Sequence, residues 1–168
     1  MNMISIFLGL MMMLNPSLST QLFCKSEDSI ELIDIEFISD RIGWLYGTSG
    51  TLLLTTDSGE NWKNISLKTE SQFKDMDFID SQNGWILATF GGTTSDILFR
   101  TKSGGENWTT IPLDSIYCPS RIINLYNLCL FSEIDFINSD TGFILFKNRK
   151  LLKTVDGGIN WFPVNIFK

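Results

Sequence analysis

The sequence predicts an all-β chain built from three copies of a four-stranded antiparallel unit. Two repeated signatures support this fold class. The stretch TTDSGENW at 55–62 returns as TKSGGENW at 101–108 and as TVDGGINW at 154–161. Each copy is preceded by a second motif, which reads DIEFI at 34–38, DMDFI at 75–79 and EIDFI at 133–137. Because the two signatures always occur in the same order, we interpret them as parts of one structural repeat.

The first strand of each unit is expected at the DIEFI-type motif, where apolar and acidic residues alternate. In the first unit, Ile33, Ile35 and Phe37 alternate with Asp34 and Glu36. A polar turn follows, and the second strands are expected to begin at three glycine–aromatic pairs: Gly43-Trp44, Gly84-Trp85 and Gly142-Phe143. The apolar runs at 52–54, 97–99 and 151–152 predict the third strands.

The repeated Thr-x-Asp-x-Gly-x-x-Trp stretch is expected to be a turn that leads into the fourth strand at the Trp. Its residues are Thr55, Asp57, Gly59 and Trp62, then Thr101, Ser103, Gly105 and Trp108, then Thr154, Asp156, Gly158 and Trp161. The Asp can accept backbone N–H bonds, the Gly permits an unusual backbone angle, and the Trp packs the turn. Ser103 carries no charge, so the second turn is expected to be the least stable. A feature that recurs in every unit favours a structural role over a catalytic one.

Two prolines place the fourth strand at the outer edge of each sheet. Pro112 and Pro163 cannot donate a ladder hydrogen bond, so they belong on edge strands. Four-stranded antiparallel units that recur every ~40–50 residues are typical of β-propeller blades. We therefore predict a signal peptide at 1–19 and a three-bladed propeller region at 20–168. Blade one covers about 30–69, blade two about 70–115, a connecting insertion about 116–130, and blade three about 131–168.

The turn motif resembles the Asp-box, or BNR, repeat. Together with the preceding Phe and the Gly-aromatic pair, it is similar to the repeat of the photosystem II assembly and stability factor family of propellers. The resemblance covers roughly 30–168 and implies a β-propeller that does assembly or scaffolding work on another protein. The acidic pairs on the predicted first strands depart from the basic, arginine-rich surface patch that members of that family share.

Three blades are fewer than the four to eight of known closed propellers. An open fan would expose an apolar face at each end, and such faces are interaction surfaces or aggregation liabilities. Three explanations stay open: two chains close a six-bladed ring, the chain is a fragment of a longer one, or a partner covers the open faces.

The charge and composition exclude several classes of site. The net charge is −6 and there is no histidine, which disfavours nucleic-acid binding and removes His-based metal sites and Ser-His-Asp triads. No cofactor is expected. The acidic pairs are Asp34/Glu36, Asp75/Asp77 and Glu133/Asp135. They predict either an acidic channel that attracts a cation or a basic peptide, or solvated strand ends.

The N-terminus is apolar from Met3 to Leu14, which is too short to span a bilayer of ~30 Å. Its length favours an export signal cleaved near Ser17 and Ser19, and hence a periplasmic or extracellular location. A miscalled start or a short membrane-associated tail is the alternative.

The insertion between blades two and three is the candidate for a specific surface. It holds Tyr117, Cys118, Arg121, Tyr126 and Cys129. In an exported chain Cys118 and Cys129 could form a disulfide, which would leave Cys24 over. Tyr117, Arg121 and Tyr126 would then form an interaction surface; a disulfide-tied loop without a partner is the alternative.

Two functional hypotheses follow. The first is a non-catalytic interaction or assembly module whose partner is another protein or a second copy of the chain. The second is a carbohydrate-binding or sialidase-like propeller fragment. Sialidases use a Tyr nucleophile and an arginine cluster. The four arginines are Arg41, Arg100, Arg121 and Arg149, and none lies in an Arg-Ile-Pro context. We therefore expect no enzymatic activity.

Overall fold

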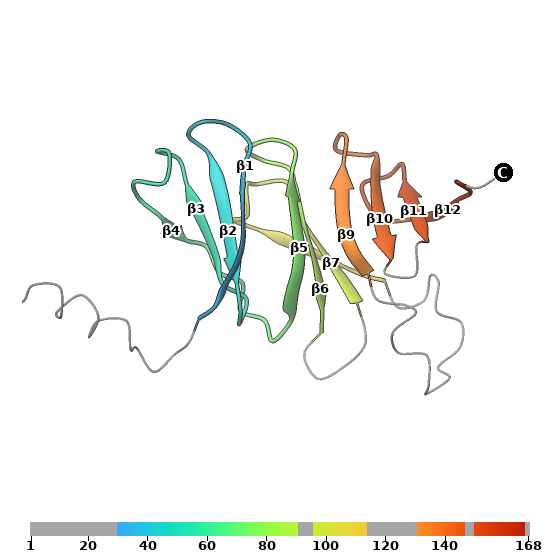
Figure 1. Cartoon of the computed structure of the whole chain (residues 1–168), viewed down its shortest axis with the longest axis horizontal. Coiled ribbons are helices and arrows are strands. Elements are labelled where there is room, and N and C mark those ends of the chain that lie inside the picture. Colours follow the sequence, from blue (N-terminus) through green and yellow to red (C-terminus); the bar gives the residue numbers. More distant parts are fainter. Residues whose placement is uncertain (1–29, 91–95, 114–130, 147–149, 167–168) are drawn as a thin grey trace, which may run out of the picture.

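A computed structural model describes residues 30–90, 96–113, 131–146 and 150–166. In this part of the chain, the strands form three four-stranded sheets that stand side by side, and these confirm the predicted all-β, incomplete propeller (Figure 1). Blade one contains β1 (Leu32–Phe37), β2 (Gly43–Gly47), β3 (Leu52–Thr55) and β4 (Lys63–Asn64). Blade two contains β5 (Gln72–Phe78), β6 (Gly84–Thr89), β7 (Asp96–Thr101) and β8 (Trp108–Pro112). Blade three contains β9 (Phe131–Phe136), β10 (Gly142–Phe146), β11 (Leu151–Thr154) and β12 (Phe162–Val164).

Each sheet is antiparallel and follows the order of the chain, so the first strand is one edge and the fourth strand the other. The predicted prolines therefore lie on edge strands, Pro112 in β8 and Pro163 in β12. The fourth strand begins at the Trp in blade two alone. In blades one and three it begins one residue later, at Lys63 and Phe162.

A bulge interrupts the alternation of each first strand. Ile33 has no partner between the pairs Leu32↔Gly47 and Asp34↔Tyr46, and Lys74 and Ser132 are skipped in the same way in β5 and β9. The extra residue re-aims the start of the strand. The predicted alternation placed Ile33 on the same face as Ile35 and Phe37. Because of the bulge, Leu32 instead occupies the strand position that Phe73 and Phe131 have in blades two and three.

The hydrophobic core lies between the blades. We call the cluster between blades one and two the first joint; its buried residues are Trp44, Tyr46, Leu52, Phe73, Met76, Phe78, Ile86, Ala88 and Phe99. The second joint, between blades two and three, consists of Trp85, Leu87, Leu98, Leu113, Phe131, Ile134, Phe136, Ile144, Phe146, Leu152 and Trp161. Alternate residues of the blade-two strands enter different joints, which follows from the period of two of a β-strand.

Candidate functional site

The Thr-x-Asp-x-Gly turn is held by one hydrogen-bond network. Thr55 Oγ1 donates to Asp57 Oδ1 at 2.9 Å and accepts from Gly59 N at 2.9 Å. Asp57 also accepts from Asn61 N at 2.9 Å and from Asn61 Nδ2 at 2.7 Å. The hydrogen bonds from Asn61 and Thr55 hold the pKa of Asp57 below its usual range. Both carboxylate oxygens are therefore engaged within the turn.

The third turn repeats this network and the second keeps part of it. Asp156 accepts from Asn160 N at 2.9 Å and from Asn160 Nδ2 at 2.8 Å. Ser103 Oγ accepts from Asn107 N at 2.9 Å, but a hydroxyl has no second oxygen for the Asn107 amide. The lower stability expected for the second turn stays a prediction.

The turns also receive the tryptophans of the preceding blade. The Trp44 ring stacks on Phe78 with the ring centroids 3.8 Å apart, and Trp44 Nε1 donates to the Gly104 carbonyl at 3.3 Å. The second joint repeats this contact. The Trp85 and Phe136 centroids are 3.6 Å apart, and Trp85 Nε1 donates to Gly157 O at 3.1 Å. Each joint thus connects the second strand of one blade to the first strand and turn of the next.

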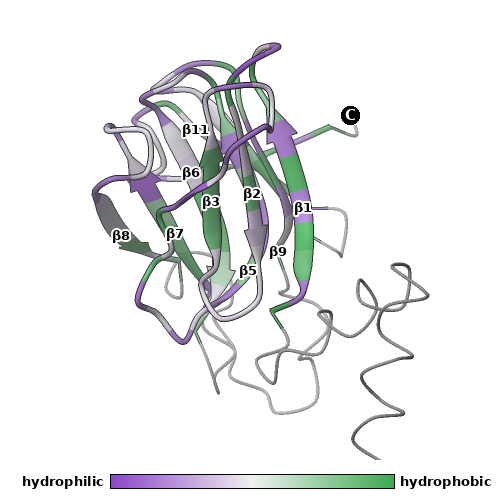
Figure 2. Ribbon diagram, turned by 90° about the vertical axis from the view of Figure 1, so that its left-hand side faces the viewer, coloured by the Kyte–Doolittle hydropathy of each residue, from purple (hydrophilic) through white to green (hydrophobic). Residues whose placement is uncertain are grey.

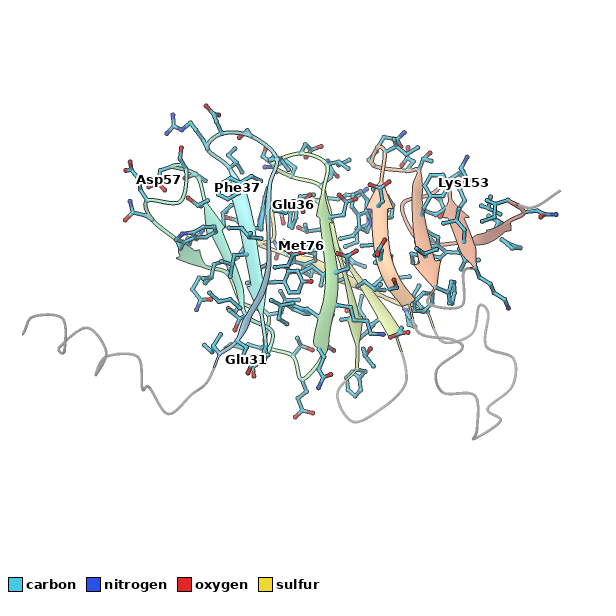
Figure 3. The ribbon with its side chains drawn as sticks, in the orientation of Figure 1. Glu31, Glu36, Phe37, Asp57, Met76 and Lys153 are labelled. Atoms are coloured by element: carbon cyan, nitrogen blue, oxygen red, sulfur yellow. The ribbon has the colours of Figure 1, made fainter. Side chains whose placement is uncertain are left out.

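Acidic residues of the first strands connect neighbouring blades. Glu36 Oε2 accepts from Phe78 N at 3.1 Å, across the first joint; Figure 3 shows Glu36 beside β5. Asp75 Oδ2 accepts from Ile134 N at 2.7 Å, and Asp77 Oδ2 accepts from Phe136 N, both across the second joint. The sequence predicts these acids on the first strand of each blade, which lies at the edge opposite the fourth strand, but it does not predict their bonds to the next blade. A signal was present, since each acid directly precedes the residue whose counterpart in the next blade donates the N–H group to it.

We call the six carboxylates of Asp34, Glu36, Asp75, Asp77, Glu133 and Asp135 the acidic row. Burial, reinforced by the charge of Asp77, raises the pKa of Glu36 to about 8. Burial and the charge of Asp135 raise the pKa of Asp77 to about 6, and the pKa of Asp75 is also raised by burial. Burial, with a smaller contribution from neighbouring acids, therefore lets Glu36 retain its proton near neutral pH, while the exposed acids of the row carry the negative charge.

Each end of the fan carries half of a joint. The leading face of blade one consists of Leu32, Ile35 and Phe37; Figure 2 looks onto the blade-one side. The trailing face of blade three consists of Phe143, Lys153 and Ile137 with the exposed acids Glu133 and Asp135. In the described part of the chain, no blade covers either face.

Several predicted residues lie outside the described residues. They are Cys24, the predicted signal peptide at 1–19, and Tyr117, Cys118, Arg121, Tyr126 and Cys129 of the predicted insertion. Within the described ranges, no group of three or more Asp, Glu, His or Cys side chains is placed to hold a metal ion. The same ranges contain no helix long and apolar enough to cross a membrane.

A family model described as "Photosynthesis system II assembly factor YCF48" matches residues 19–128 of the 168-residue chain. The chain belongs to this family. The family resemblance stated from the repeat motifs is thereby confirmed. The Ycf48 family model ends before blade three, but the three sheets have the same plan.

Curated relatives have the same family character. The chain is 33% identical over 103 residues to the chloroplastic photosystem II stability/assembly factor HCF136 of Arabidopsis thaliana, covering 56% of this chain and 24% of that protein. It is 31% identical over 87 residues to the photosystem II assembly lipoprotein Ycf48 of Synechococcus sp. (strain CC9902), covering 49% and 24%. The chain spans about a quarter of the length of these relatives.

Solved structures show the same fold. A structure described as YCF48 bound to D1 peptide matches with a TM-score of 0.63 and 25% identity, over 80% of this chain and 39% of that one. An ancestral GH74 enzyme matches with a TM-score of 0.54 and 16% identity, over 78% and 18%. The second likeness concerns the fold alone.

Proposed function

We propose that the chain is a non-catalytic, exported module that binds another polypeptide during the assembly of a larger protein complex. Membership in the Ycf48 family supports an assembly role, and the related YCF48 structure with a bound D1 peptide supports a polypeptide as the partner. Export is supported by the apolar stretch from Met3 to Leu14. Because the chain spans about a quarter of its curated relatives, the proposal concerns the module and not the activity of a whole relative.

The acidic row is the observation that favours a basic partner. It concentrates six carboxylates on three neighbouring inner strands of a chain whose net charge is already −6. One oxygen of Glu36, Asp75 or Asp77 binds a backbone N–H, while Asp34, Glu133 and Asp135 are exposed. Such a surface attracts a positively charged segment, and the attraction weakens as salt is added.

The non-catalytic part of the proposal is supported by the hydrogen bonds of the turn carboxylates. Asp57 and Asp156 are each bound by a Thr hydroxyl and an Asn side chain, which leaves them poorly suited to proton transfer. Most glycosidases need a free pair of carboxyl groups across the scissile bond. The carbohydrate-binding alternative stays a prediction. Self-association also stays a prediction of the sequence and would use the two end faces.

The test is the binding of a short fluorescent Lys-rich peptide to the full chain, measured by fluorescence anisotropy at two salt concentrations. The test variant combines Asp34→Asn, Glu133→Gln and Asp135→Asn. Amide oxygens still accept hydrogen bonds, so the variant removes charge and keeps acceptors. We expect the Kd to increase at least about tenfold and the salt dependence to weaken, because the focusing charge is lost.

The matched control removes three carboxylates from the turns that follow the first strands, one in each blade. It combines Asp40→Asn, Asp80→Asn and Asp140→Asn, all at exposed positions. Asp80 accepts from Gln82 N and Asn83 N, and Asn138 makes the equivalent bonds in blade three, so Asn is accommodated there. The control should bind the peptide as the parent does. Equal loss in both variants, or no binding by the parent, would contradict an acidic peptide site.

A further inference from the structure

The leading face of blade one carries apolar residues like those buried in the two joints, but here they are exposed to solvent. Leu32, Ile35 and Phe37 are 59%, 50% and 45% exposed. Their counterparts are buried in both joints: Phe73, Met76 and Phe78 in the first, and Phe131, Ile134 and Phe136 in the second. Apolar side chains at these strand positions are therefore covered by a neighbouring blade in blades two and three and are uncovered in blade one. A contiguous apolar face of this kind marks an interaction surface.

The backbone of β1 shows the same difference. In blade three, Ile134 N donates to Asp75 of the preceding blade. In both joints the Phe of the first strand also donates its N–H to an acid of the preceding blade, Phe78 to Glu36 and Phe136 to Asp77. The N–H groups of an edge strand are a template for pairing with another chain. Phe37 is the counterpart of Phe78 and Phe136 in blade one, and in the described part of the chain no preceding blade supplies a carboxylate for it.

The trailing face of blade three carries that missing half. Glu133 and Asp135 occupy the strand positions of Asp75 and Asp77, and both are exposed. Ile137 is 66% exposed, whereas Ile79 and Ile38 at the same position pack against the second and first joints.

An aromatic–cation pair completes the trailing face. In blade two, Arg100 lies over the Trp85 ring, 5.6 Å from its centroid, and Arg100 Nη2 donates to Ser139 O of blade three at 2.9 Å. In blade three, Lys153 Nζ lies 5.8 Å from the Phe143 centroid at the corresponding positions. Figure 3 shows Lys153 on the part of blade three that is remote from blade two. The pair that contacts the next blade in the second joint is therefore reproduced where no blade follows in the described chain.

We propose that the trailing face of blade three docks onto the leading face of blade one of a second copy, so that two copies close a six-bladed ring. Glu133 and Asp135 would accept the N–H groups of Ile35 and Phe37, and Phe143 would lie on Phe37. Six blades fall within the range of closed propellers. The contact is head-to-tail, and closure prevents such contacts from growing into filaments. Glu133 and Asp135 also belong to the acidic row, but their amide variants retain the acceptor oxygens, so loss of peptide binding in those variants and loss of the dimer are separate outcomes.

This third joint lacks one hydrogen bond of the other two. Trp44 and Trp85 donate their indole N–H to Gly104 O and Gly157 O of the following turn. Phe143 has no N–H, and Ser58 occupies the position of the two glycines in the turn of blade one. The joint between copies is therefore weaker than the joints within a copy, which makes the dimer reversible and its strength adjustable.

The experiment measures the mass of the full chain by light scattering and sedimentation velocity over a range of concentrations. The expected result is a monomer–dimer equilibrium whose upper limit is twice the 19.1 kDa chain mass. A monomer at every concentration would overturn the proposal. Mass that grows continuously with concentration would overturn the closed ring.

Two exposed isoleucines test which faces meet. Ile35→Lys blocks the leading face and Ile137→Lys blocks the trailing face, and each variant alone should weaken the dimer at least about tenfold because a charge enters an apolar joint. An equimolar mixture should recover dimers, since one unblocked leading face then meets one unblocked trailing face. If Ile137→Lys dimerises normally while Ile35→Lys does not, blade one pairs with itself and the occupant proposed here is wrong.

Val155→Lys is the matched control. Val155 is 58% exposed in the third turn, and Lys102 already occupies the equivalent position in blade two. It should dimerise like the parent, and circular dichroism should show equal folding for all three lysine variants. Phe143→Trp should strengthen the dimer. The new indole N–H can donate to the Ser58 carbonyl of the second copy, so the dimer Kd should decrease. A Kd unchanged by Phe143→Trp would contradict the proposed position of Phe143 in the joint.

Discussion

The Asp–Asn pairs of the first and third turns show what a single side chain adds to a blade. Asp57 and Asp156 each use one oxygen for the backbone N–H and the other for the amide of the Asn four residues later. Asn107 is present at that place in the second turn, but Ser103 engages its N–H alone. In blade two, the Asn107 side-chain amide is therefore available to bind a carboxylate introduced at position 103.

Ser103→Asp should therefore stabilise the protein. One additional charge-assisted hydrogen bond contributes about 1 kcal/mol, which corresponds to an increase in Tm of about 2–4 °C for a chain of this size. Thermal unfolding by circular dichroism measures it. Thr56→Asp, at the outward position of the first turn, adds the same charge without an Asn amide to bind and should leave the Tm nearly unchanged. A lower Tm for Ser103→Asp than for Thr56→Asp would refute the assignment.

At the level of elements, the phenylalanine that ends each first strand has two environments: it is buried in a joint in blades two and three and exposed in blade one. Phe136 is stacked under Trp85 and is 4% exposed, whereas Phe37 has an edge contact with Trp62 of its own blade and is 45% exposed. Removing a buried Phe costs about 3–5 kcal/mol of unfolding free energy, because transfer and cavity terms add.

Phe136→Ala should consequently destabilise the chain by about 3–5 kcal/mol, and Phe37→Ala by less than about half of that. Chemical denaturation at a concentration where the chain is monomeric measures both. Phe78→Ala in the first joint should resemble Phe136→Ala. Equal costs for Phe37 and Phe136 would mean that the face of β1 is covered within one chain.

The sequence was informative about elements and less so about contacts between them. The positions of the twelve strands in the described residues follow from the repeat, since each copy carries its own alternation and turn residues, and the second and third copies also carry an edge proline. The bulges at Ile33, Lys74 and Ser132 were not predictable from alternation, because one extra residue leaves no compositional trace. The carboxylate–N–H bonds across the joints were also missed, since they depend on how closely one blade approaches the next. The predicted disulfide and interaction surface lie in residues 114–130, outside the described residues, and both stay predictions.

At the scale of the whole molecule, the acidic row makes stability depend on pH. Burial raises the pKa of Glu36 from 4.5 to about 8, and that of Asp77 from 3.8 to about 6. Between the lower and the raised pKa of each group, the carboxyl is protonated in the folded chain and ionised in the unfolded chain. The unfolded state then binds fewer protons, so the free energy of unfolding falls as the pH rises through this window.

We expect the Tm to decrease between about pH 5 and pH 8.5, and Glu36→Gln to remove most of the decrease above about pH 6, since Gln cannot ionise. The Gln amide oxygen can still accept from Phe78 N, which separates the charge from the hydrogen bond. Glu60→Gln, at an exposed position of the first turn, is the control and should follow the parent profile. A Tm that rises across the window, or an unchanged slope in Glu36→Gln, would contradict this account.

The division of each joint between two blades has a consequence for how such genes can lengthen. Every blade carries acids and an aromatic for the blade after it, and apolar strand residues and a turn carbonyl for the blade before it. A tandem duplication of one blade therefore inserts a segment that already fits both neighbours, and no compensating substitution is required. Gene duplication can therefore change the number of blades one blade at a time. At the two ends of the array, a substitution alters one half of a contact without disturbing a joint inside the chain.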